Sequence, residues 1–167
     1  MLWHEDLGVV GLTPLLLDLG CDEVTAWRDL GSVTGISADG TVLCGEGVNP
    51  DVHMEAWIAD ITELYLLVES IDLSLVSSRD RTQAIATVLV KDLTGSPAVG
   101  AVVTGHWSGS ATGTVQGTTD SAGRAVLTSA KIKNASTFTL TVDELTKALR
   151  VHDTYRDLET TKTVWVE

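Results

Sequence analysis

Four histidines are the residues of this sequence best suited to catalysis or metal binding. They stand at His4, His53, His106 and His152, roughly 50 residues apart, whereas the histidines of a zinc site usually lie within a few residues of each other on one element. A Ser/His/Asp site would need a turn that presents the nucleophile, and no such strand-to-helix turn is predicted. No G-x-S-x-G, H-E-x-x-H, P-loop or C-x-x-C motif occurs. We therefore expect solvent-facing histidines and no enzyme activity.

Oxygen ligands gather in one region and make calcium the ion to consider. Asp39, Glu46, Asn49 and Asp51 lie in or beside one loop system, and they offer the hard oxygens that calcium prefers. Turn chemistry explains two of them equally well, because Asp39-Gly40 suits a hairpin turn and Asn49-Pro50 starts a loop. The turn interpretation is favoured, with calcium as the alternative, and no other cofactor is expected.

Cys21 and Cys44 are the two cysteines of the chain. One disulfide is compatible with their spacing, but free cysteines usually behave as small buried hydrophobic residues. Two buried or half-buried thiols are the favoured expectation.

The charge excludes two classes of partner. The formal net charge is −12, from 11 basic and 23 acidic residues, so clustered cations for nucleic acid or anionic lipid are not expected. No apolar run approaches the ~18 residues that a membrane span needs, so no membrane insertion is expected. The first residues, Met1 to Asp6, do not resemble a signal peptide. This leaves a cytoplasmic protein or a piece of a longer secreted one.

Residues 1–69 mix helical and strand patterns. Thr13-Pro14 predicts a helix N-cap followed by proline at the first helical position, and Gly20 predicts its end. A second short helical stretch is expected from Asp22 to Asp29. The remaining expected elements are strands Val33–Ser37 and Thr41–Cys44 around an Asp-Gly turn, a loop from Gly45 to His53, and a strand Glu55–Ala59.

Residues 70–167 alternate between apolar and polar side chains and contain regular turn signals. This is the pattern of an antiparallel β-sandwich. Phe138 and Trp107 are the expected core anchors, and Asp143–Leu149 is expected to form a short helix or a crossover. The predicted strands are Asp72–Ser77, Thr82–Lys91, Ala98–Trp107, Gly113–Thr118, Gly123–Ala130, Thr137–Val142 and Lys162–Val166. The predicted inward residues are Ala86, Val88, Val90, Ala101, Val103, Trp107, Ala125, Leu127, Phe138, Leu140 and Val142.

The first part resembles the repeat of the bacterial extracellular HAF family. The resemblance is carried by Gly35-Ile36-Ser37-Ala38-Asp39-Gly40, by Gly45-Glu46-Gly47-Val48-Asn49-Pro50 and by Glu55-Ala56-Trp57-Ile58-Ala59. It implies a propeller-like β segment on a secreted or surface-anchored protein. One blade cannot bury both of its faces, so the resemblance also implies missing neighbouring repeats and a region that does not fold alone.

The second part is similar to bacterial Ig-like domains. The resemblance is carried by Val88-Leu89-Val90-Lys91-Asp92, by Gly105-His106-Trp107-Ser108-Gly109 and by Thr137-Phe138-Thr139-Leu140-Thr141-Val142. It implies a sandwich that serves as a spacer or binding module of a secreted protein, and it fixes no ligand.

Some apolar side chains are predicted to face outward. If Val88 and Val90 point inward, Ile85 and Leu89 point to the outer face. Near the C-terminus, either Trp165 or its neighbours Val164 and Val166 must also face out. Ile85, Leu89 and Trp165 are therefore the candidate interaction surface.

These patterns together predict an all-β chain, with a propeller-like segment at 1–69 and an Ig-like sandwich at 70–167. The expected function is that of a non-enzymatic, secreted or cell-surface structural and adhesive module that contacts protein, either itself or a neighbouring surface protein. The alternative is a polysaccharide-binding or spacer tail of a secreted hydrolase. It ranks second because the few aromatic residues of the chain are needed in the core.

Overall fold

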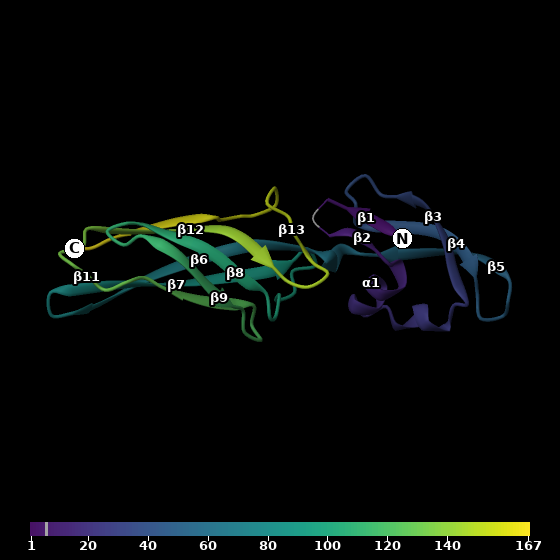
Figure 1. The fold of residues 1–167 in the computed structure, drawn as a ribbon, viewed down its shortest axis with the longest axis horizontal. Coiled ribbons are helices and arrows are strands. Elements are labelled where there is room, and N and C mark those ends of the chain that lie inside the picture. Colours follow the sequence, from purple (N-terminus) through teal and green to yellow (C-terminus); the bar gives the residue numbers. More distant parts are fainter. Residues whose placement is uncertain (6) are drawn as a thin grey trace. The chain divides into compact units, whose positions relative to one another are not determined.

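The computed structural model describes residues 1–5 and 7–167 and divides the chain into two compact units (Figure 1). Unit 1 is Met1–Leu64 and unit 2 is Tyr65–Glu167. The boundary precedes the predicted one because strand β6 (Tyr65–Ser78) begins at Tyr65. Both units are mainly β, as the sequence predicts, and most strand pairs are antiparallel. In the described part of the chain, no helix combines the length and apolar character that crossing a bilayer requires.

Unit 2 is a sandwich of two sheets. One sheet has the order β10-β7-β6-β13, with β11 also paired to β7, and the other has the order β14-β12-β8-β9. After β6, the strands are β7 (Arg81–Asp92), β8 (Val102–Gly109), β9 (Gly113–Thr118), β10 (Arg124–Thr128), β11 (Ile132–Lys133), β12 (Thr137–Thr146), β13 (Val151–His152) and β14 (Thr161–Trp165).

The core of unit 2 lies between the two sheets and follows the predicted alternation. All of the predicted inward residues are buried, from Ala86 on β7 to Val142 on β12. Phe138 and Trp107 meet edge to face, with ring centroids 6.4 Å apart and an interplanar angle of 88°. Such pairs add about 0.5–1.5 kcal/mol to the apolar burial of the rings. These two rings are therefore the aromatic centre of the sandwich.

Unit 1 consists of one three-stranded sheet with short helices and a small hairpin. The sheet has the order β3-β4-β5, so β5 is an edge strand. The elements are β1 (Leu2–His4), β2 (Gly8–Val10), α1 (Leu12–Asp18), the 3₁₀ helices η1 (Asp22–Ala26) and η2 (Thr62–Leu64), β3 (Asp29–Ile36), β4 (Val42–Val48) and β5 (Met54–Asp60).

The apolar side of α1 repeats at helical spacing. Leu12, Leu15, Leu16 and Leu19 are buried, which is the i, i+3, i+4, i+7 stripe of a helix that packs on one side. The helix begins at Leu12 with Gly11 as N-cap, so the predicted N-cap at Thr13 is wrong. Pro14 is the third helical residue, a position where its missing N–H costs no hydrogen bond. Gly20 follows the helix with φ +80°, which confirms the predicted end.

Gly45 in β4 makes room for the ring of Trp57. A Cβ at Gly45 would collide with the Trp57 ring and with the carbonyl oxygen of Ser32. The ring is thereby held on the inner side of the sheet, and its Nε1 donates a hydrogen bond to the carbonyl oxygen of Leu30 at 2.7 Å. Trp57 is 9% exposed and is the large aromatic residue of this core.

Several predicted boundaries are wrong for local reasons. The predicted helix from Asp22 to Asp29 is a single 3₁₀ segment that ends at Ala26, because Trp27 is already extended. Most of the predicted loop after Cys44 is strand β4, which continues to Val48 opposite Met54. The first four residues of the expected helix or crossover at 143–149 are instead the end of β12, which continues past a register shift at Val142/Glu144, and a turn follows it. Neither cysteine forms a disulfide, and Cys44 is exposed, because its side of β4 faces outward.

Candidate functional site

A groove lies beside the edge strand β5 in unit 1. Its volume is about 310 Å³, at the small end of the range for ligand pockets. Trp27 and Trp57 supply aromatic surface, and Glu23 and Asp60 supply carboxylates. The complete lining is Leu16, Cys21, Glu23, Val24, Trp27, Leu30, Trp57, Ile58, Ala59 and Asp60. We call it the β5 groove.

Local hydrogen bonds favour the charged form of Asp60 in the β5 groove. The hydroxyl of Thr62 and then its N–H donate to the Asp60 carboxylate and hold its pKa below the usual range. Burial raises the pKa of the Cys21 thiol, and the carboxylates of Glu23, Glu63, Asp60 and Asp22 raise it further. The β5 groove therefore has an apolar floor inside a negative field, which suits a cation that also carries apolar surface.

The outward side of the same sheet is rich in exposed apolar side chains. Cys44, Met54, Ala56 and Ile58 share this side, because Cys44 pairs with Ile58 and Val48 pairs with Met54. Met54 is 66% exposed and Ile58 is 76% exposed. We call this set the open face. No sequence pattern singled out the open face or the β5 groove, because the groove joins residues from α1, η1, β3 and β5.

The four calcium candidates do not come together. Asp39 precedes β4 and Asn49 follows it, and a seven-residue strand is roughly 20 Å long. The Asp39 carboxylate accepts hydrogen bonds from the hydroxyls of Ser37 and Thr41, as expected of a turn residue. The Asn49 side chain donates to Glu55 and accepts from the N–H of His53. Among residues 1–5 and 7–167, no group of three or more His, Cys, Asp or Glu is arranged to hold a metal ion.

The three predicted surface residues face outward but do not form one surface. Ile85 and Leu89 lie on β7, on the outer side of the first sheet, and are half-buried beside Thr128 and Arg124 of β10. Trp165 lies on β14, on the outer side of the second sheet, and is 68% exposed. A single patch of Ile85, Leu89 and Trp165 is therefore wrong, because the sandwich separates its two outer faces.

The outer side of the second sheet is covered by hydroxyl groups. The hydroxyls of Thr139 and Thr163 lie 2.8 Å apart, and Thr161 donates to Thr141 at 3.2 Å. Trp165 stands at the end of this row, opposite Thr137. An exposed indole beside a row of hydroxyls is an arrangement that can stack on a sugar ring and bind its hydroxyl groups.

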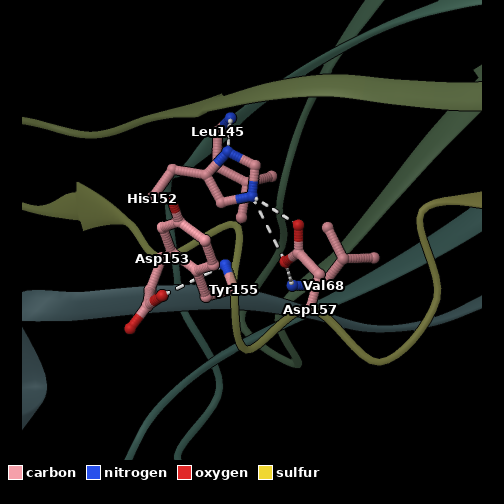
Figure 2. A network of polar contacts seen from close by, with 6 residues as sticks. All are labelled: Val68, Leu145, His152, Asp153, Tyr155 and Asp157. Carbon is pink, nitrogen blue, oxygen red and sulfur yellow. Dashed lines mark hydrogen bonds and ion pairs between the residues drawn. The ribbon is translucent and has the colours of Figure 1, made fainter.

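His152 and Asp157 form the most buried polar pair of unit 2 (Figure 2). Their side chains are 10% and 2% exposed, so the expectation of a solvent-facing histidine is wrong for His152. Nδ1 of His152 accepts the N–H of Leu145 at 3.2 Å, and Nε2 lies 3.0 Å from the Asp157 carboxylate. Because Nδ1 is an acceptor, Nε2 carries the proton and donates a hydrogen bond to Asp157. Both ring nitrogens are thus used within the fold and are not available to a substrate.

The same segment covers the edge of β6. Asp157 accepts the N–H of Val68 at 2.6 Å, and Glu159 accepts the N–H of Ile71 at 2.8 Å. Between these two, Leu158 donates its N–H to the carbonyl oxygen of Val68 at 2.9 Å. We call residues 151–160 the strap. Its carboxylates take the place of a neighbouring strand, which satisfies an edge that would otherwise offer free N–H groups.

A second histidine–aspartate pair lies on the surface. Nδ1 of His106 is 2.9 Å from the carboxylate of Asp143, and both side chains are more than 40% exposed. His106 belongs to the hydroxyl-covered side of the second sheet, between Thr104 and Ser108 on β8. This pair is part of a polar surface and is consistent with the solvent-facing histidine that the sequence predicts there.

Comparison of the chain with protein-family models, with curated proteins and with solved structures gives no match in any of the three.

Proposed function

We propose that this chain is a non-enzymatic structural and adhesive interaction module of a secreted or cell-surface protein. The observation that carries the proposal is the open face, on which Met54 and Ile58 expose most of their apolar side chains to water. Exposed apolar clusters of this kind mark contact sites for other proteins. The partner is a protein, either a further copy of the chain or a neighbouring surface protein. The placement outside the cell rests on the two family resemblances.

The two units have different parts in this proposal. Unit 2 supplies a closed core and a covered β6 edge, which are properties of a rigid spacer. Unit 1 supplies the open face and the β5 groove, which are properties of a contact element. The strap uses its histidine and carboxylates for hydrogen bonds within the fold, so this segment contributes stability.

Attachment of coated beads tests the proposal. Beads that carry the intact chain are expected to cluster with each other or to attach to bacterial cells. Met54→Lys/Ile58→Lys should reduce this adhesion, because two charges are placed on the open face. Val99→Lys/Val126→Lys is the matched control, since both valines are exposed on unit 2. If beads with the intact chain neither cluster nor attach, or if the control loses adhesion equally, the proposal fails.

Polysaccharide binding is the second candidate, and Trp165 beside its row of threonines favours it. It predicts that the chain is retained on immobilised insoluble glycans and that Trp165→Ala loses this retention. Tyr155→Ala is the control, because Tyr155 is fully exposed in the strap. Equal retention of wild type and of both variants would rule out the Trp165 surface as the sugar site.

A further inference from the structure

The charge of the chain is concentrated in unit 1. Residues 1–64 contain 12 acidic residues and one basic residue, Arg28, which is not part of the groove lining. Residues 65–167 contain 11 acidic and 10 basic residues and are therefore close to neutral. A partner that contacts unit 1 must offset this negative field, and the walls of the β5 groove are where carboxylates and aromatic rings occur together.

One end of unit 2 carries a compact group of basic side chains. The turn between β6 and β7 contains Arg79, Arg81 is the first residue of β7, and β11 places Lys133 directly opposite Arg81. Nζ of Lys133 lies 2.8 Å from the carboxylate of Asp80, and Arg81 donates to the carbonyl oxygen of Lys131 at 3.4 Å. All four basic residues are exposed, with Asp80 as the one acid among them. We call Arg79, Arg81, Lys131 and Lys133 the basic tip.

We propose that the basic tip of one copy of this chain docks into the β5 groove of a second copy, which gives head-to-tail assembly. This inference rests on the proposed function and names the partner and the surfaces. Arg79 has left-handed backbone geometry with φ +56° and lies at the apex of the turn, so it is at the very end of the hairpin. A guanidinium group that enters the groove can stack on Trp27 or Trp57 and pair with Glu23 or Asp60.

Apolar contact can accompany the charge pairing. Val76 of β6 lies just before the basic turn and is 48% exposed, and Ile58 lines the groove with 76% of its surface exposed. β5 is also the free edge of its sheet in the described residues, so the approaching hairpin meets unpaired backbone groups. β6 is roughly 45 Å long. Tyr65 lies at one end of it and the basic tip lies at the other end. We therefore assign the contact to a second copy.

Charge also decides how the copies are arranged. A two-fold dimer through unit 1 would bring together two surfaces of the same strong negative charge, and like charges across an interface are unfavourable. A head-to-tail contact places the nearly neutral unit 2, basic tip first, against unit 1. A head-to-tail contact uses two different surfaces, so each bound copy leaves one surface free for a further copy. The assembly therefore extends into a chain of copies unless it closes as a ring.

Sedimentation velocity of the intact chain tests the assembly. In 50 mM NaCl the average mass is expected to rise with protein concentration. In 500 mM NaCl the association constant should fall by about tenfold or more, because salt screens exposed charge pairs. Glu23→Lys/Asp60→Lys and Arg79→Glu/Arg81→Glu should each abolish self-association. Glu5→Lys/Asp51→Lys is the control, with the same change in charge at exposed positions of unit 1 outside both the groove lining and the open face.

A mixture of Glu23→Lys/Asp60→Lys with Arg79→Glu/Arg81→Glu tests the contact most directly. The groove variant keeps its basic tip and the tip variant keeps its groove, so the mixture should form a one-to-one complex that does not extend. If Glu23→Lys/Asp60→Lys fails to fold by circular dichroism, Glu23→Gln/Asp60→Asn replaces it with the same expectation.

Three outcomes would overturn the inference: a monomeric wild type at low salt, equal loss of assembly in the control variant, or a mixture without the one-to-one complex. If wild-type beads still attach to bacterial cells in these cases, the proposed adhesive function survives and only the second copy is rejected as partner. If attachment is absent as well, both fail.

Discussion

Nε2 of His152 lies 3.0 Å from the carboxylate of Asp157, which also accepts the N–H of Val68 at 2.6 Å. One carboxylate thereby binds both a histidine of the strap and the backbone of β6. The pair resembles half of a catalytic triad, but its second ring nitrogen accepts the Leu145 N–H. The strap is therefore a structural device of the sandwich edge, and its disruption should be visible in stability.

Asp157→Ala should lower the free energy of unfolding by about 2–4 kcal/mol. The substitution leaves two nearly buried donors, Val68 N–H and His152 Nε2–H, without an acceptor, and each unsatisfied donor costs about 1–3 kcal/mol. Urea denaturation of the intact chain measures the change. Glu144→Ala, at an exposed position of β12, should change it by less than about 0.5 kcal/mol. A similar small change for Asp157→Ala would contradict the account of the strap.

Asp39 should make the hairpin of unit 1 sensitive to acid. Hydrogen bonds from the side chains of Ser37 and Thr41, and from the Thr41 N–H, lower the pKa of Asp39 from 3.8 to about 2. Because the folded pKa is lower, this contribution to stability is fully present above pH 3.8 and is lost as the pH falls through about 2. Titration of the Asp39 carboxyl carbon by NMR should give a midpoint near 2. A midpoint at 3.8 would mean that the turn is not formed in solution.

Gly45→Ala should destabilise unit 1 and displace the ring of Trp57. A Cβ at Gly45 meets both the ring and the backbone of β3, and backbone cannot move aside without loss of strand pairing. We expect a red shift of the tryptophan emission and a lower unfolding temperature. Gly35→Ala is the control in the same sheet, because its Cβ would meet only the flexible Cys44 side chain, at 3.0 Å. Equal effects of the two substitutions would show that Trp57 does not rest on Gly45.

The two cysteines should react at different rates. Cys44 is exposed, whereas Cys21 is half-buried and its thiol pKa is raised by burial and by neighbouring carboxylates. Because the thiolate is the reactive form, iodoacetamide at pH 8 should modify Cys44 first. Mass spectrometry of timed samples reads out the order, with Cys44→Ser isolating the slower site. Faster modification of Cys21 would contradict the negative field of the β5 groove.

Alternation predicted the core of unit 2 because each of its strands has one buried side. Phe138, Leu140 and Val142 are buried, while Thr137, Thr139 and Thr141 between them are part of the outer face. The start of β6 was not predicted as a strand, for the opposite reason. Leu66, Leu67 and Val68 are all buried, so no alternation marks this stretch as a strand.

The β5 groove and the strap could not be derived from local patterns. The β5 groove depends on Leu16, Trp27 and Asp60, which meet only after the sheet has formed. The strap depends on Asp157 meeting Val68, which is 89 residues away in the chain. One feature of the sequence could have indicated the negative charge around the β5 groove. The first 64 residues are strongly acidic, whereas acidic and basic residues are nearly equal in number in the remainder.

Hydrogen–deuterium exchange of the intact chain tests the central claim, that this protein acts by contact through unit 1, most directly. Exchange is compared at low and high protein concentration in 50 mM NaCl. The account predicts slower exchange at high concentration in β5 and in the β6–β7 turn with the adjoining Arg81, with β14 unchanged. Unchanged exchange in both β5 and the turn, or protection confined to the surface around Trp165, would contradict it.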